Sequence, residues 1–71
     1  MKHELKILID ADGKTNLPVV QYTASLGESP SESDILTLAN QMASRVHDTY
    51  TLKSWVLYAY VGGAELDSGS F

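Results

Sequence analysis

The segment from Ser29 to His47 limits the fold more than any other, because it has the start signal and the periodicity of one amphipathic helix. Ser29 can cap the first free amides, Pro30 fits the first helical position, and Glu32 can complete a capping box. Apolar residues then recur at helical spacing, namely Ile35, Leu38, Ala39, Met42, Ala43 and Val46. The sequence therefore predicts a helix from about Pro30 to His47, with Arg45 and His47 at the end that favours bases.

Two strand patterns precede this helix. The segment from His3 to Asp10 alternates apolar and polar residues, which is the period of a half-buried strand. The loop 10–16 contains an Asp-Gly pair that can supply the positive backbone angle of a hairpin turn. Leu17 to Ser25 follows as a second strand, in which Pro18 lacks an amide donor and suits a sheet edge. We therefore predict an antiparallel hairpin.

A third strand pattern follows the helix. Thr51 to Val61 is an almost uninterrupted β-branched and aromatic run, which predicts a strand covered on both faces. Glycines 62–63 can make a two-residue turn, after which 64–67 can return as a short edge strand before a tail at 68–71. The crossover through the helix would lay the third strand beside the first and antiparallel to it. We expect a small α+β domain of order ββαβ(β), with three or four antiparallel strands and one helix on one face.

The size of the chain excludes several classes of protein. Its 71 residues, 44% of them hydrophobic, predict a single domain spanning 1–71 that buries about 60% of its unfolded surface. Because the chain has no cysteine, disulfides, thiolate nucleophiles and cysteine zinc sites are excluded. No run approaches the roughly 20 apolar residues of a membrane span. We expect a cytoplasmic protein without a cofactor.

The charge is acidic, with 5 Lys and Arg against 9 Asp and Glu and a net charge of −4. This balance argues against direct nucleic-acid binding, which needs clustered bases. Carboxylates recur two residues apart, about 6–7 Å along an extended chain, which is near the charge spacing of a nucleic-acid strand. The candidate partner-binding residues are Glu28, Glu32, Asp34, Glu65 and Asp67, followed by Asp10 and Asp12. The alternative is that these acids serve only solubility.

Other chemistry is thinly represented. The two histidines, His3 and His47, have no nucleophile or ligand motif around them, so we expect no enzyme. The Asp10-x-Asp12 pair resembles the start of a calcium loop, but Gln21 stands where that loop needs a bidentate Glu. A solvated hairpin loop is the better interpretation.

Four aromatic residues form the remaining candidate surface: Tyr22, Trp55, Tyr58 and Tyr60. Rings that stack on nucleic-acid bases lie beside basic grooves, and here only Lys53 is near the third strand. Core and sheet packing is therefore the preferred interpretation. If one face of that strand stays uncovered, the rings would instead form a protein-contact surface.

The pentapeptide Glu32-Ser33-Asp34-Ile35-Leu36 is similar to a stretch in phage inhibitors of uracil-DNA glycosylase, which are acidic DNA mimics with a helix-and-sheet fold. In size, acidity and α+β order the chain also resembles small phage proteins that inhibit the nucleoid protein HU by covering its DNA-binding surface. These resemblances imply a non-enzymatic, phage-encoded inhibitor that binds a basic host protein in the bacterial cytoplasm. The alternative is a structural or assembly subunit that oligomerises through a sheet edge or an exposed aromatic face. A monomer and a homodimer both remain open.

Overall fold

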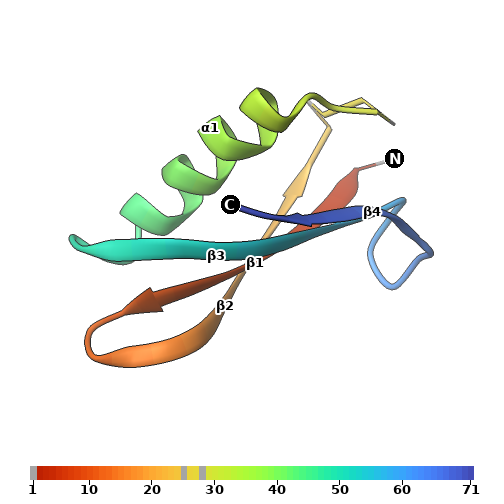
Figure 1. Cartoon of the computed structure of the whole chain (residues 1–71). Helices are drawn as coiled ribbons and strands as arrows, with labels where there is room; N and C mark the ends of the chain where they lie inside the picture. The colour runs from red at the N-terminus through yellow and green to blue at the C-terminus, as the bar shows by residue number, and fades with distance from the viewer. Residues whose placement is uncertain (1, 25, 28) are drawn as a thin grey trace.

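Alternating apolar residues build the sheet on which the fold rests. The computed structural model describes residues 2–24, 26–27 and 29–71. Its elements are β1 (His3–Ala11), β2 (Lys14–Thr23), α1 (Glu32–Ser44), β3 (Tyr50–Tyr58) and β4 (Glu65–Ser70). The four strands are antiparallel in the order β2-β1-β3-β4, and α1 lies across one face (Figure 1). The predicted α+β class is confirmed, and β3 does lie beside β1.

The β1–β2 hairpin closes more tightly than predicted. Asp12 and Gly13 form a two-residue turn with φ angles of 54° and 74°, and Ala11 pairs with Lys14 across it. Two consecutive positive angles match the twist of the flanking strands, so β2 begins at Lys14 and not at Leu17. The strand is an edge strand, as its proline predicts, and the predicted end at Ser25 lies outside the described residues.

The helix begins two residues later than predicted. Its N-cap is Ser31, whose Oγ accepts a hydrogen bond from the Asp34 amide at 3.2 Å, while Asp34 Oδ2 accepts from the Ser31 amide at 3.4 Å. The sequence holds two overlapping capping frames, and this second frame is used instead of the one from Ser29 to Glu32. Pro30 therefore lies before the cap and not at the first helical position.

The helix also ends earlier than predicted. Arg45 is its C-cap, and the amides of Val46 and His47 both donate to the Ala43 carbonyl, at 3.1 and 2.9 Å. This shared acceptor ends the helical hydrogen-bond pattern. Val46 is consequently 64% exposed and does not belong to the apolar face of the helix, and no base lies in the last turn.

The prediction for the third strand is correct in its position and wrong in its surroundings. β3 ends at Tyr58 and not at Val61, because Gly62 has a φ of 76° and the Gly63 amide donates to the Tyr60 carbonyl at 2.8 Å. Coverage of both faces is wrong, since Val56 and Tyr58 are only partly buried. The helix covers one face of the sheet, and no other element among the described residues covers the opposite face.

The predicted C-terminal tail is part of the sheet. β4 continues to Ser70, and the Phe71 amide still donates to the Lys53 carbonyl at 3.1 Å. Ser68, Gly69 and Ser70 have poor strand propensity, but they pair with Val56, Trp55 and Ser54 of β3. Backbone hydrogen bonds with the neighbouring strand β3 therefore determine that this segment is a strand.

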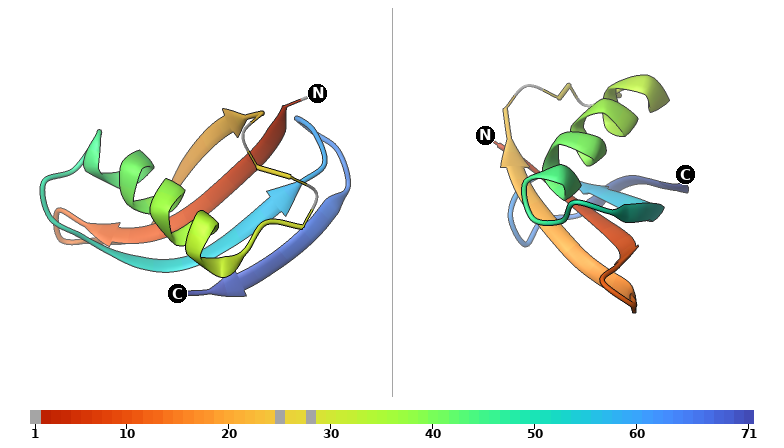
Figure 2. Two further views of the ribbon diagram at one scale, coloured as in Figure 1. Left: turned by 90° about the horizontal axis from the view of Figure 1, so that it is seen from above. Right: turned by 90° about the vertical axis from the view of Figure 1, so that its left-hand side faces the viewer.

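The core lies between α1 and one face of the sheet, and Figure 2 shows the helix crossing that face diagonally. On β1 the buried residues are every second one, so one side of the strand points at the helix. The side chains that share this core are Leu5, Ile7, Ile9, Ala11, Leu26, Ile35, Leu38, Ala39, Met42, Ala43, Trp55 and Leu57. Full burial of each large apolar side chain contributes about 1.5–3 kcal/mol.

Candidate partner-binding surface

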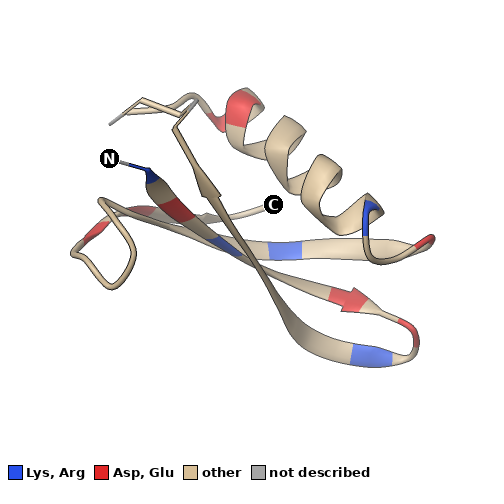
Figure 3. Cartoon of the chain, turned by 180° about the vertical axis from the view of Figure 1, so that it is seen from behind, with Lys and Arg blue, Asp and Glu red and all other residues tan. Residues whose placement is uncertain are grey.

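The hairpin half of the molecule is balanced in charge. We define it by three acids and three bases, Asp10, Asp12, Asp48, Lys14, Arg45 and Lys53. The first two acids lie at the β1–β2 turn, and the connection from α1 to β3 reaches the same turn through an interaction of His47 with Asp12. Acidic and basic residues lie together in this region (Figure 3), and their formal charges sum to zero.

The two acids that the sequence places in the hairpin are already engaged. Asp10 Oδ1 accepts a hydrogen bond from the Asn16 amide at 3.1 Å, and its Oδ2 lies 3.5 Å from Lys53 Nζ. Asp12 Oδ2 lies 2.6 Å from His47 Nδ1, which joins two segments 35 residues apart. Asp10 therefore links the end of β1 to β2 and β3, and Asp12 links the hairpin turn to the connection after α1. No local pattern in the sequence indicates the contact between Asp12 and His47.

The other half carries the acidic excess. We define this acidic half by five carboxylates, Glu4, Glu32, Asp34, Glu65 and Asp67. Only two described bases, Lys2 and Lys6, accompany them. The acids come from the start of β1, the start of α1 and from β4, and Figure 3 shows them away from the hairpin turn. Glu4 was not among the predicted residues, because its stretch of sequence is balanced by lysines. Glu28 lies outside the described residues.

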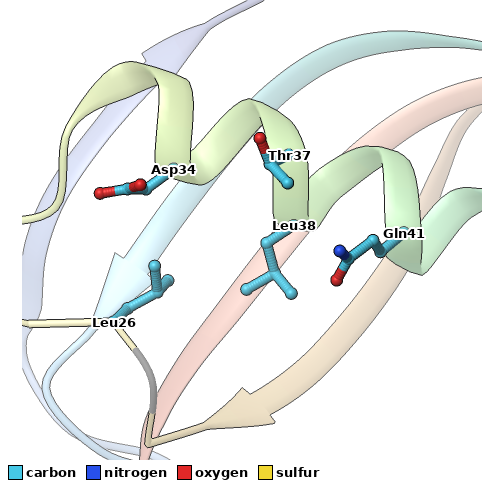
Figure 4. A pocket seen from close by; sticks show the side chains of 5 residues that line it. All are labelled: Leu26, Asp34, Thr37, Leu38 and Gln41. Carbon is cyan, nitrogen blue, oxygen red and sulfur yellow. The ribbon is translucent and has the colours of Figure 1, made fainter.

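The carboxylates of the acidic half do not form a flat ladder of charge. Glu32 and Asp34 are helical, so the spacing of an extended chain does not apply to them. Asp34 lines a hollow beside Leu26 (Figure 4), whereas Glu32 lines a different hollow with Trp55 and Phe71. Along β4, Asp67 faces the helix side because it pairs with Leu57, and Glu65 pairs with Tyr58.

The five acids differ in how much of their charge is free for a partner. Asp34 closes the capping box of α1, and Asp67 Oδ1 accepts from the Ser68 amide at 2.8 Å. Within the described residues, Glu32 and Glu65 form no ion pair and both are exposed. These two glutamates are therefore the acids that a partner can reach without breaking an internal interaction.

A shallow groove runs between α1 and the end of β4. Its volume is about 220 Å³, and it is lined by Glu32, Leu36, Trp55, Ser70 and Phe71. Leu36 is 45% exposed and Phe71 is 39% exposed, whereas the indole of Trp55 is buried against Gly69. The groove offers an apolar floor beside an acidic rim.

A second surface is the sheet face that points away from the helix, which we call the open face. It consists of three rows of side chains that the register aligns across the strands: Tyr22, Glu4, Tyr58 and Glu65; Val20, Lys6, Val56 and Ser68; Pro18, Leu8, Ser54 and Ser70. Val20 is 41% exposed and Tyr22 is 52% exposed. Two of the four aromatic residues picked out in the sequence thus share a face, while Trp55 is in the core and Tyr60 is in the turn after β3.

The two histidines lie apart in the part of the chain that the structure describes. His3 Nδ1 is buried without a hydrogen-bond partner in the described part of the chain, and His47 Nδ1 is hydrogen-bonded with Asp12 Oδ2. Nowhere among the described residues do three or more His, Asp or Glu side chains gather as metal ligands. No helix of residues 2–24, 26–27 and 29–71 has the length and apolar character needed to cross a membrane.

Comparisons with known proteins add no assignment. No family model, curated protein or solved structure matches this chain. Its function must therefore be inferred from its own surfaces.

Proposed function

We propose that this chain is a non-enzymatic acidic protein that binds a basic host protein and keeps DNA away from it by mimicking DNA. The target that we expect is a DNA-binding protein such as the nucleoid protein HU. The observation that supports the proposal is the separation of charge. Among the described residues, the acidic half contains five carboxylates and two lysines, whereas the hairpin half contains equal numbers of acids and bases.

Separated charge gives such a protein a directed approach to its partner. A patch of one sign steers an oppositely charged surface toward it, which raises the association rate and makes binding sensitive to salt. Glu32 and Glu65 are exposed and carry no internal ion pair among the described residues, so their full charge acts outward. Asp34 is a poorer choice for mutation, because its replacement also removes the half of the α1 capping box in which its carboxylate accepts from the Ser31 amide.

The test is competition between the protein and a labelled DNA duplex for HU. The double substitution Glu32→Lys with Glu65→Lys is expected to weaken binding at least about tenfold, because it reverses the two most available charges. The affinity of the wild type should fall as salt rises from about 50 to about 200 mM.

Matched single substitutions separate location from total charge. Glu65→Lys and Asp48→Lys change the net charge equally, but only the first lies in the acidic half. The proposal requires Glu65→Lys to weaken binding more than Asp48→Lys does. Equal effects of the two, or an affinity that does not change with salt, would overturn it.

A second candidate function is a small subunit that assembles with copies of itself. One observation favours it, namely the open face, which leaves Val20 and Tyr22 exposed beside partly buried Leu8 and Val56. Exposed apolar surface of this kind is typical of protein contacts. A mass measured by sedimentation distinguishes the candidates, because apolar association persists at high salt and charge steering does not.

A further inference from the structure

The open face combines apolar borders with a central pair of opposite charges. Glu4 and Lys6 are two residues apart on β1, an inner strand, and both side chains point away from the helix. Tyr22 and Tyr58 lie on either side of Glu4. The next row places valines on either side of Lys6, so apolar and aromatic side chains of β2 and β3 flank both charged groups. The edge strand β4 adds Glu65 and Ser68 at the end of these two rows.

This pattern is complementary to itself. A twofold contact brings the same surface of each copy together, so that residue i meets residue j and residue j meets residue i. If two open faces stack with their β1 strands antiparallel, Glu4 of each copy lies opposite Lys6 of the other. The same operation lays the row of Tyr22 and Tyr58 over the row of Val20 and Val56.

We propose that two copies of this chain associate through their open faces in this register. The inference deepens the second candidate function and rests on it. A basic partner fits this face less well, because Lys6 stands at its centre and would repel it. A nucleic acid is likewise opposed by Glu4. A second copy is the occupant that satisfies both charges at once.

The size of the face predicts how stable this association is. Four strands about 4.8 Å apart and three rows about 6.8 Å apart give about 400 Å² of flat area on each copy. Specific interfaces bury about 1,200–2,000 Å² in total, counted over both partners. Two open faces together give about 800 Å², which is below this range, so the dimer should be weak and should dissociate on dilution. Because Glu4 and Lys6 lie next to the twofold axis, the two hairpin turns would lie at opposite ends of the dimer and the two acidic halves near its middle.

The test is the monomer–dimer equilibrium of charge-swap variants, followed by sedimentation over a range of protein concentrations. Glu4→Lys and Lys6→Glu are each expected to weaken dimerisation at least tenfold, since each places two like-charged pairs in the interface. The double variant with both substitutions restores the pairs in reversed order, so its dimerisation should return close to that of the wild type. Glu32→Lys and Lys14→Glu are the matched controls, because they change the net charge equally away from the open face.

A neutral variant keeps the inference testable if a charge-swap variant fails to fold. Val20→Ser removes an exposed apolar group from the open face, and Val46→Ser removes one from the connection after α1. Only the first should weaken dimerisation. Circular dichroism of each variant at low concentration checks that the monomer is folded.

The outcomes separate the inference from the functions on which it rests. A wild-type chain that is monomeric at every concentration overturns both the inference and self-assembly. A dimer that is unaffected by Glu4→Lys and Val20→Ser would show that the open face is not the dimer interface, although the chain would still self-assemble. Failure of the double variant to recover overturns the register. If Val20→Ser weakens the binding of HU while the wild type stays monomeric, the open face belongs to the basic partner and the inference is wrong.

Discussion

The indole of Trp55 lies over Gly69 on the neighbouring strand, so closely that a Cβ at Gly69 would come within 2.9 Å of the ring. The two residues are directly paired between β3 and β4. The indole is buried and belongs to the core, while Gly69 is part of an edge strand that has few apolar side chains of its own. Through this contact the backbone of β4 packs against a core side chain.

Replacement of Gly69 by alanine tests that contact. The new methyl group must displace the indole or the strand, and overpacking of this kind costs about 1–3 kcal/mol. We expect Gly69→Ala to lower the free energy of unfolding by that amount, measured with urea. Gly27→Ala is the control, because a Cβ there meets nothing within 4 Å. Unchanged or increased stability of Gly69→Ala would show that the ring does not hold β4.

The two capping frames at the start of α1 allow a direct comparison. Removal of an N-cap hydroxyl costs about 1 kcal/mol, because a helix amide loses its acceptor. Ser31→Ala is expected to show this loss in thermal or urea unfolding, since Ser31 Oγ accepts from the Asp34 amide. Ser29→Ala should change the stability by less than half as much. The reverse order would place the cap at Ser29.

The same frames explain how far sequence reasoning reached for the helix. Apolar spacing located α1 and its buried residues, because periodicity extends over many positions and survives small errors. The exact start depends on which of two serines meets an amide, and both have an acid three residues later. Local pattern alone could not choose between Ser29 and Ser31.

The parts that sequence reasoning missed depend on partners far along the chain. Ser68 and Ser70 have low strand propensity, and they are strand residues only because β3 offers an aligned edge. The contact of His47 with Asp12 joins positions 35 residues apart. Among the candidate acids, Glu4 was missed because Lys2 and Lys6 cancel it in the sequence, although it lies among the other acids in space.

The contact between His47 and Asp12 gives a third prediction. Asp12→Asn keeps an oxygen acceptor and tolerates the φ of 54°, so it removes only the charge. Because the Asp12 side chain is 65% exposed, we expect the free energy of unfolding to fall by less than about 1 kcal/mol. The loss should shrink at high salt, which screens exposed charges. Asp48→Asn, also exposed, is the control, and an equal loss in both variants would mean that the pairing with His47 contributes nothing.

The proposed dimer makes the thermal stability depend on protein concentration. If only the folded chain associates, each increase in concentration shifts the equilibrium away from the unfolded state. We expect the melting temperature of the wild type to rise over a hundredfold range of concentration. Glu4→Lys should remove most of this rise, because it disrupts the dimer, and Glu32→Lys, on the helix side, should keep it. A constant melting temperature for the wild type would contradict the dimer, since Glu4, Lys6 and their apolar neighbours would then face water in the folded protein.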